Sequence, residues 1–287
     1  MNTQEKIKNG KVVGRGIQWC THTWNVNAGC FHRCRWTMPD GSVAICYAEE
    51  IAKKFTVGYP LGFEHSYWRP QNLTEPLKLK DPAKIFLDSM SDLFGHWVEA
   101  DQINQILDVC QQAHWHTFQS LTKNAPKLLK FKFPKNVWVG ASSPPDSMMG
   151  KPLQAHQQEA MLERILQTLT QVRKDNGVVT WASFEPLSWD VSKLVARYPL
   201  ALRWSVIGAA TNGPKVYQPN PDHVQNLLDV LDNQNVPVFF KGNLWGNPAA
   251  KVWREYFPGY IPSPYMAMEL GPHAVPTERK KAQLTLL

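Results

Sequence analysis

Three of the five cysteines lie between residues 29 and 50, at Cys30, Cys34 and Cys46. Cys20 and His22 precede them in the chain. Thiolates gathered in this way bind soft metal centres, either zinc or an iron–sulfur cluster. Because cysteines are few and odd in number, metal or redox chemistry explains the group better than disulfides do.

The spacing of the three thiols leaves both kinds of centre open. A closed zinc site needs a fourth ligand, for which Cys20, His22 and His32 are available. A [4Fe–4S] cluster held by only three cysteines leaves one iron free to bind S-adenosylmethionine. Reduction then cleaves the sulfonium and yields a 5′-deoxyadenosyl radical. Three unrelated buried cysteines are a third interpretation.

The gap between the second and third cysteine is unusual for a radical enzyme. Cys30 and Cys34 have the common C-x3-C spacing, but eleven residues, RWTMPDGSVAI, separate Cys34 from Cys46 instead of two. The PDG sequence at 39–41 predicts a tight turn, so this segment is expected to form a hairpin that returns Cys46 to the other two.

The elements that must position these thiols follow a regular alternation. Short β-branched and aromatic runs predict strands at GIQWC (16–20), KIFLDSM (84–90), HTFQSLT (116–122), NVWVGAS (136–142), VVTWASF (178–184), LRWSVIGA (202–209) and VPVFFKG (236–242). Amphipathic patterns predict helices at 46–55, 99–113, 154–172 and 221–235.

Strands that alternate with helices imply right-handed crossovers and a parallel sheet. Seven repeats favour an α/β fold of the β/α (TIM-like) barrel type, whole or incomplete, with the cysteine-bearing loop after strand one. The expected organisation is an N-terminal extension at 1–15, the barrel at 16–262 and a C-terminal tail at 263–287.

Polar or small residues close every predicted strand, and in β/α barrels the active site forms at these strand ends. The residues are Cys20 and His22; Ser89, Ser91 and Asp92; Gln119 and Lys123; Ser142 and Ser143; Glu185; Gly208 and Thr211; and Lys241 and Asn243. The segment 56–82 precedes strand two, so we expect it at the opposite end, with Tyr67 and Trp68 packing rather than reacting.

Composition indicates which partners the protein could bind and in which compartment we expect it. The net charge of +7 is compatible with a nucleic-acid partner, and a solvated basic surface explains it equally well. No run approaches the ~20 apolar residues of a membrane span. The polar start of the chain also lacks an apolar signal region, so we expect a reducing, cytoplasmic setting.

Several stretches together resemble a family of phage and bacterial proteins of unknown function that carry a three-cysteine motif and are described as radical-SAM-like. They are TWNVNAGC…CYAEEIAKKF, EPLKLKDPAKIFLDSMSDLFG, HTFQSLTKNAPKL, SFEPLSWD, WSVIGAATNG and VPVFFKG, within residues 16–245. The resemblance implies a β/α barrel, S-adenosylmethionine and a [4Fe–4S] cluster bound by Cys30, Cys34 and Cys46. Cys20 stands where other members commonly have threonine, so it is not counted as a ligand.

Two stretches depart from the family pattern. GASSPP (140–145) replaces a GVSVEN-like stretch, and GAATNGP (208–214) replaces a GGESGP-like stretch, with loss of an acidic residue. These departures concern the substrate more than the cofactor and indicate a subfamily with a substrate of its own.

The strand-end residues divide between two expected roles. Cofactor binding is assigned to Ser89, Ser91, Asp92, Gln119 and Ser142. Asp92 would accept from the methionyl ammonium, or else cap the next helical turn. Catalytic roles are assigned to Lys123, Glu185 and Lys241, although an ion pair between Lys241 and Glu185 is an alternative.

The sequence therefore favours a radical-SAM enzyme that modifies or repairs a nucleic acid or nucleotide, with a flavodoxin- or ferredoxin-like electron donor. A non-catalytic nucleic-acid-binding protein with a zinc or cluster site is the alternative, in which Cys20 or His22 matters as much as Cys46. A third hypothesis is a barrel hydrolase that uses Lys123 and Glu185 and needs no iron.

Overall fold

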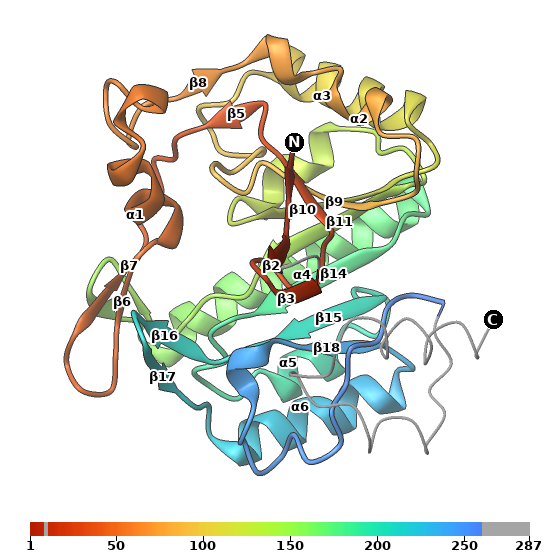
Figure 1. Cartoon of the computed structure of the whole chain (residues 1–287). Helices are drawn as coiled ribbons and strands as arrows, with labels where there is room; N and C mark the ends of the chain where they lie inside the picture. Colours follow the sequence, from red (N-terminus) through yellow and green to blue (C-terminus); the bar gives the residue numbers. More distant parts are fainter. Residues whose placement is uncertain (9–10, 260–287) are drawn as a thin grey trace.

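A computed structural model describes residues 1–8 and 11–259 of the chain. Its centre is an eight-stranded sheet with the order β1-β4-β9-β10-β11-β14-β15-β18 (Figure 1). The seven strands from β4 onwards are parallel and follow chain order, while β1 pairs with β4 in the antiparallel sense. The prediction of an α/β fold with a parallel sheet is thus confirmed. The strands span Asn2–Thr3 (β1), His22–Trp24 (β4), Lys84–Leu87 (β9), Thr117–Thr122 (β10), Val137–Ser142 (β11), Thr180–Phe184 (β14), Trp204–Ile207 (β15) and Val238–Phe240 (β18).

The four predicted helices are confirmed, since helices occupy all four segments. They are α1 (Tyr47–Lys54), α3 (Ala100–Gln112), α4 (Ala155–Asn176) and α6 (Pro221–Asn233), with shorter α2 (Glu75–Lys78) and α5 (Ser192–Ala196). Capping boxes begin α3 at Glu99 and α4 at Gln154. Helix α4 runs four residues past its predicted end, to Asn176, and the following Gly177, with a φ of 62°, forms a left-handed C-cap.

The prediction of a first strand at 16–20 is wrong. These residues form a turn, and the strand of the sheet is β4, which begins at His22. Gly16 donates to the Gln4 carbonyl, and Trp19 and Cys20 are buried beneath the sheet. The prediction that Cys20 and His22 follow the first strand is therefore wrong. Cys20 precedes β4, and His22 is the first residue of β4.

The two faces of the sheet bury different side chains. On the outer face, aliphatic residues pack beneath the helices in one large core. On the inner face lies an aromatic cluster of Trp19, Phe86, Trp181, Trp204 and Phe239. The ring centroids of Trp19 and Trp204 are 6.1 Å apart, so the two halves of the sheet curve around one interior. Among the described residues β18 does not pair with β4 or β1, so the sheet is open.

Small hairpins extend the loops that follow the strands. They are β6–β7 (Arg35–Thr37 and Val43–Ile45), β12–β13 (Ser147–Met148 and Lys151–Pro152) and β16–β17 (Ala210–Asn212 and Lys215–Tyr217). The first of them confirms the hairpin predicted between Cys34 and Cys46. Figure 1 shows β6–β7 and β16–β17 side by side, and Asn212 donates to the Ser42 hydroxyl across them.

The segment 56–82 does not lie wholly at the opposite end, contrary to prediction. Its β8 (Tyr67–Trp68) pairs with β5 (Asn27–Ala28), next to the cysteine loop. The amide of Cys30 donates to the Phe63 carbonyl at 2.8 Å. Tyr67 and Trp68 pack in apolar clusters, as expected of them.

The remaining elements are the β2–β3 hairpin (Glu5–Lys8 and Lys11–Arg15) and four 3-10 turns, η1 (Thr56–Gly58), η2 (Pro70–Asn72), η3 (Ala125–Lys130) and η4 (Gly242–Leu244). The predicted boundary at 262/263 lies outside the described residues. No described helix combines the length and apolar character needed to cross a bilayer.

Candidate functional site

The cysteine loop is fixed by backbone contacts around Gly29. Its amide donates to the Met90 carbonyl at 2.9 Å, and its carbonyl accepts from the Ser91 hydroxyl at 2.7 Å. Gly29 has a φ of 82°, and a Cβ there would lie 1.6 Å from the His65 carbonyl oxygen. Only glycine fits this position, which sets the path of the chain into Cys30.

An ion pair joins the two ends of the hairpin that separates Cys34 from Cys46. Arg35 donates from both guanidinium nitrogens to the Glu49 carboxylate, at 2.7 and 2.9 Å, and also to the Cys34 carbonyl at 2.8 Å. Glu49 lies on the first turn of α1, whose N-cap is Cys46. This bidentate contact brings Cys34 and Cys46 to one place despite their separation in sequence.

The three thiols share one environment. Cys30 and Cys46 pack against Ala48, Ala52 and Phe63, and all three cysteines are partly buried. Burial raises the pKa of the Cys30 thiol to about 12, and proximity to Cys34 and Cys46 adds to the effect. The Cys30 sulfur also accepts a hydrogen bond from the backbone of His32. Such N–H···S bonds tune thiolate ligands of clusters.

Charged groups from the next two strands border the thiols. The buried Asp92 carboxylate accepts from His32 Nε2 at 2.7 Å and from the Lys123 amide at 2.9 Å. Burial alone would raise the pKa of Asp92, but these hydrogen bonds outweigh it and lower the pKa. Asp92 also accepts from the Phe94 amide at 3.0 Å, so it caps the following turn.

Solvent reaches the side chain of Lys123, and the thiols lie close to it. The surrounding protein would lower the pKa of Lys123, but the nearby Cys34 and Cys46 outweigh this effect and raise it. Lys123 in turn partly offsets the rise in the pKa of Cys34. The structure thus brings this predicted residue to the cysteines.

The serines after β9 face the same loop. Ser91 Oγ donates to the Gly29 carbonyl, and Ser89 Oγ donates to Asn25 Oδ1 at 3.1 Å. The Tyr47 hydroxyl donates to the Ser89 carbonyl at 2.7 Å. Desolvation and the neighbouring Cys46, Cys20 and Glu185 raise the pKa of Tyr47, although half of its side chain is exposed.

A second group of predicted residues lies at the ends of β14 and β18. Lys241 and Glu185 form a partly buried ion pair, which is the alternative considered for them. Gly208 lies beside them, since a Cβ there would be 3.0 Å from Glu185 Cγ.

The remaining predicted residues point into the interior of the sheet. Ser142 is the last residue of β11, on the same face as Gly140, which is crowded by the Trp181 indole. Gln119 is fully buried and donates to the Trp19 carbonyl at 3.3 Å, deeper than the cysteines. Its Oε1 has no hydrogen-bond partner among the described residues.

Sequence reasoning missed His32 as the partner of Asp92, Tyr47, and the contact between Arg35 and Glu49. Only the last had a signal in the sequence, since an Arg and a Glu flank the two ends of the expected hairpin.

Cys30, Cys34 and Cys46 are the soft donors that could hold a metal centre at this site. Within residues 1–8 and 11–259, no three His, Cys, Asp or Glu side chains are arranged to hold one metal ion. A single ion collects its donors around one point, whereas a cluster spreads three cysteines over three irons. Cys20 is buried within the aromatic cluster, with its thiol directed at the Ile17 carbonyl at 3.7 Å. It is therefore not placed as a fourth ligand.

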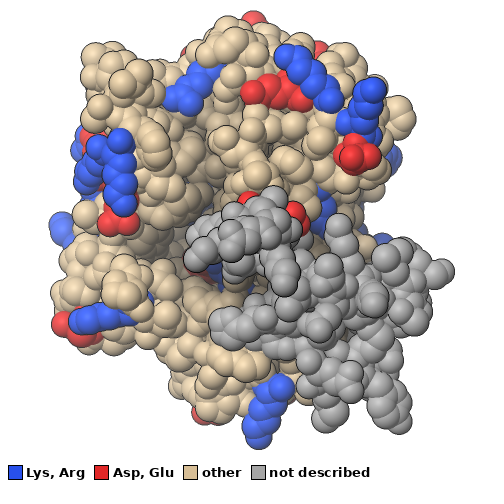
Figure 2. All heavy atoms as spheres, in the orientation of Figure 1, with Lys and Arg blue, Asp and Glu red and all other residues tan. Residues whose placement is uncertain are grey.

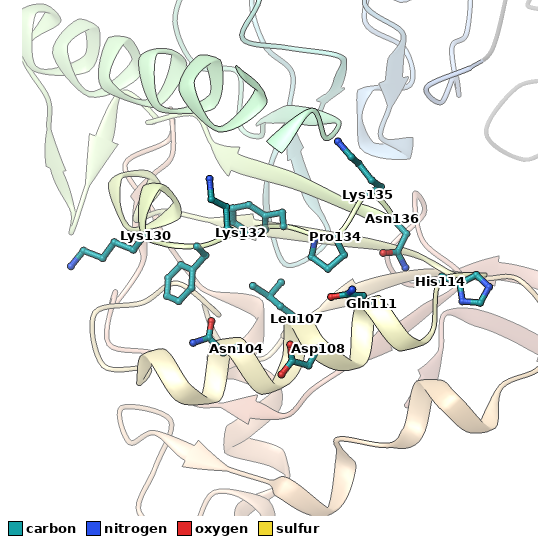
Figure 3. A pocket seen from close by; sticks show the side chains of 12 residues that line it. Asn104, Leu107, Asp108, Gln111, His114, Lys130, Lys132, Pro134, Lys135 and Asn136 are labelled. Atoms are coloured by element: carbon teal, nitrogen blue, oxygen red, sulfur yellow. The ribbon is translucent and has the colours of Figure 1, made fainter. Parts of the chain in front are cut away.

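A large groove of about 770 Å³ lies away from this site (Figure 3). It runs between α3 and the segment 130–136, which precedes β11 and so meets the amino ends of the strands. Lys135 at its rim is already bound to the Asn176 carbonyl at 2.6 Å. The groove lies at the opposite ends of the strands from the thiols, so it is not the candidate site.

A family described as "Protein of unknown function (DUF5131)" matches residues 15–281. The chain belongs to this family. The solved structures include a similar chain, "Spore photoproduct lyase complexed with dinucleoside spore photoproduct", with a TM-score of 0.41 and 9% identity. The match covers 71% of this chain and 60% of that one, less than two thirds of its length. No curated protein matches.

Proposed function

We propose that this DUF5131 protein is a radical S-adenosylmethionine enzyme. The observation that carries the proposal is the placement of three partly buried, neighbouring thiols beside the carboxyl ends of a curved parallel sheet. Active sites of β/α barrels form at this edge, so we take the open sheet to be an incomplete barrel of that type.

Cys30, Cys34 and Cys46 would hold a [4Fe–4S] cluster. When bound, such a cluster supplies the electron that cleaves S-adenosylmethionine to a 5′-deoxyadenosyl radical. The protein must deprotonate its cysteines to bind it, so loading would release protons from thiols whose pKa values burial raises.

The surrounding residues would orient the cofactor and substrate. Ser89, Ser91 and Asp92 follow β9 and border the cysteine loop, where they would position the methionyl group. Gln119 and Ser142, on the interior face, would contact the rest of the cofactor. Lys123 would attract a carboxylate or phosphate, and the Lys241–Glu185 pair would orient the substrate.

For the substrate we propose a nucleic acid or nucleotide, and for the electron donor a flavodoxin- or ferredoxin-like protein. The basic net charge supports a polyanionic substrate only weakly, because on the face shown in Figure 2 the Lys and Arg side chains are scattered, several of them beside Asp or Glu, and most of the surface is uncharged.

Anaerobic reconstitution with iron and sulfide tests the proposal. We expect about four irons per chain, a reduced-cluster EPR signal that changes on addition of S-adenosylmethionine, and release of 5′-deoxyadenosine. Cys30→Ala, Cys34→Ala and Cys46→Ala should each lose the cluster, whereas the matched controls Cys20→Ala and Cys110→Ala should keep it. One tightly bound zinc and no response to S-adenosylmethionine would overturn the proposal in favour of a binding protein.

A further inference from the structure

A small, partly open cavity lies beside the candidate site, bordered by loops that follow four strands. Its volume is about 140 Å³, and its walls come from the β6–β7 hairpin, the loops after β11 and β14, and the segment from β16 to the start of α6. Pro186, which lines it, directly follows Glu185 of the Lys241–Glu185 pair. Whatever occupies the cavity therefore lies next to the strand-end groups.

The hairpin between Cys34 and Cys46 is held in place over this cavity. Asp40 at its turn accepts from the Tyr217 hydroxyl at 2.6 Å and from Lys215 Nζ at 3.1 Å. The Thr37 amide donates to the Ser147 hydroxyl at 3.1 Å, which ties the hairpin to β12. The residues between Cys34 and Cys46 therefore have a structural role, because the hairpin that they form supplies one wall of the cavity.

The size of the cavity limits its occupant to about one ring, because cavities of ~150 Å³ hold a single benzene molecule. Flat apolar surfaces line it at Trp36, Leu187 and Tyr217, and polar groups line it at Ser188 and His223. This combination suits a planar ring with a polar edge.

Two lining residues carry hydrogen-bonding capacity that is not used. Thr37 Oγ1 and His223 Nδ1 are buried, and neither has a hydrogen-bond partner among the described residues. Buried polar atoms normally have partners. A ring that presents both N–H and C=O groups would supply them.

We propose that this cavity is a base-recognition site that holds one pyrimidine ring of the substrate, stacked on Trp36 with its polar edge toward Thr37 and His223. A purine has a second ring, which would extend out of this space toward solvent. The inference rests on the proposed function only in taking a nucleotide as the substrate class.

Calorimetric titration of the full chain, without cluster or S-adenosylmethionine, tests the site. The probes are thymidine and cytidine monophosphates against adenosine and guanosine monophosphates. Pyrimidines should bind about tenfold more tightly than purines, and Trp36→Ala should weaken pyrimidine binding about tenfold or more, as expected for loss of a stacking ring. Trp245→Ala is the matched control, since that indole is half-exposed and does not line the cavity.

Thr37→Val guards against a misfolded hairpin, because it keeps the amide bonded to Ser147 and removes only the hydroxyl. It should weaken pyrimidine binding by several-fold without changing purine binding. Equal binding of all four nucleotides, no effect of Trp36→Ala, or preferential binding of N-acetyltryptophanamide would overturn the inference. Pyrimidine preference in a chain that cannot load a cluster would overturn only the proposed function, whereas a loaded cluster without base preference would overturn only this inference.

Discussion

Asp88 is a buried carboxyl group whose protonation state depends on competing effects. It accepts from the amides of Val26 and Asn27, at 2.9 and 3.0 Å, and from the side chain of Asn27 at 3.0 Å. Burial nevertheless raises its pKa to about 7, because the loss of solvent outweighs these hydrogen bonds. The residue sits where β9 turns into the loop that faces the cysteines.

The raised pKa of Asp88 predicts that acid stabilises this part of the fold. Between its ordinary pKa of 3.8 and about 7 the folded state binds more protons than the unfolded state. The Asp88 contribution to the free energy of unfolding should therefore be fully present below pH 4 and decline as the pH rises to 7. Urea unfolding of the wild type and of Asp88→Asn at several pH values measures it.

Asp88→Asn is a suitable comparison because it is neutral at every pH and keeps one acceptor oxygen for the two amides. Asn27 Oδ1, which has no partner among the described residues, can turn to accept from the new amide nitrogen. The difference in unfolding free energy between the two proteins should change in the variant's favour from pH 4 to 7. A difference that is constant with pH would contradict the raised pKa.

At the scale of single residues, the sequence identifies the thiols of the candidate site but not the side chains that surround them. Cys30, Cys34 and Cys46 are identified by type and spacing alone. The contact between His32 and Asp92 is not, because 60 residues separate them and only the return of β9 beside β4 brings them together. Asp88 also has no signal, since an aspartate at a strand end is usually solvated.

Helix α1 and the β6–β7 hairpin act together through Glu49. Its carboxylate accepts hydrogen bonds from both guanidinium nitrogens of Arg35 and forms an ion pair with Lys53 Nζ at 2.9 Å. The Arg35 contact crosses between the two elements that carry Cys34 and Cys46, whereas the Lys53 contact lies within the helix.

Glu49→Gln should therefore impair cluster loading without removing a ligand. Loss of the charge-assisted pair frees the two ends of the hairpin, so we expect iron per chain after reconstitution to fall by about half or more. Lys53→Met is the matched control, because an exposed i,i+4 pair contributes little. Iron content and circular dichroism, measured on the same samples, separate lost loading from lost folding. Full loading of Glu49→Gln would rule out the positioning role.

Asp40 provides a test of how firmly the two hairpins are joined. Hydrogen bonds from Ser42 and Tyr217 hold its pKa well below the usual range. In Asp40→Ala, limited proteolysis should cut the 35–45 segment several-fold faster, because the hairpin loses its links to Lys215 and Tyr217. Lys151→Ala, on the β12–β13 hairpin, is the control, and unchanged cleavage in Asp40→Ala would show that other contacts are sufficient.

Hydrophobic periodicity predicts helices and strands well where each face of the element meets a single environment, either the core or the solvent. The helices at 100–112 and 221–233 and the buried strands differ from prediction by only a few residues. The strand prediction for GIQWC is wrong, although its apolar and aromatic residues are typical of a strand. These residues instead form a turn, which directs Trp19 and Cys20 into the interior. The predicted position of the segment 56–82 is wrong because the segment returns to pair with β5, and no local sequence pattern encodes this pairing.

The molecule as a whole depends on the aromatic cluster that fills its open sheet. The indole of Trp204 is fully buried and contacts Trp181, Trp138 and Trp19 at centroid distances of 4.8, 5.4 and 6.1 Å. Its Nε1 donates to the Tyr256 carbonyl at 2.8 Å. Side chains rather than backbone pairing thus link the turn before β4 to β15 across the interior of the sheet.

Trp204→Ala should destabilise the protein by about 3–5 kcal/mol, since it leaves a large cavity and removes the hydrogen bond to the Tyr256 carbonyl. Denaturant unfolding followed by circular dichroism measures the loss. Trp245→Ala, at a half-exposed position, should change stability by less than about 1 kcal/mol. Equal effects of the two substitutions would show that the interior cluster is not what holds the open sheet together.

The overall class of the fold follows from the alternation of strands and helices, but closure of the sheet does not. Whether β18 meets β4 depends on how the interior is filled, and twelve tryptophans give no indication of which ones gather there. The bulky rings of Trp181 and Trp204 occupy adjacent positions on β14 and β15 and require space that a sheet with smaller residues would not need.

A sheet that does not close has a free edge, and here a short segment after β18 covers it. Phe240 donates to the Arg254 carbonyl at 2.7 Å, and the Tyr256 amide donates to the Val238 carbonyl at 3.1 Å. A row of unpaired backbone groups on an apolar strand would template association with other copies. These few residues therefore protect the protein from aggregation, and a chain cut before Trp253 should precipitate at concentrations that the full chain tolerates.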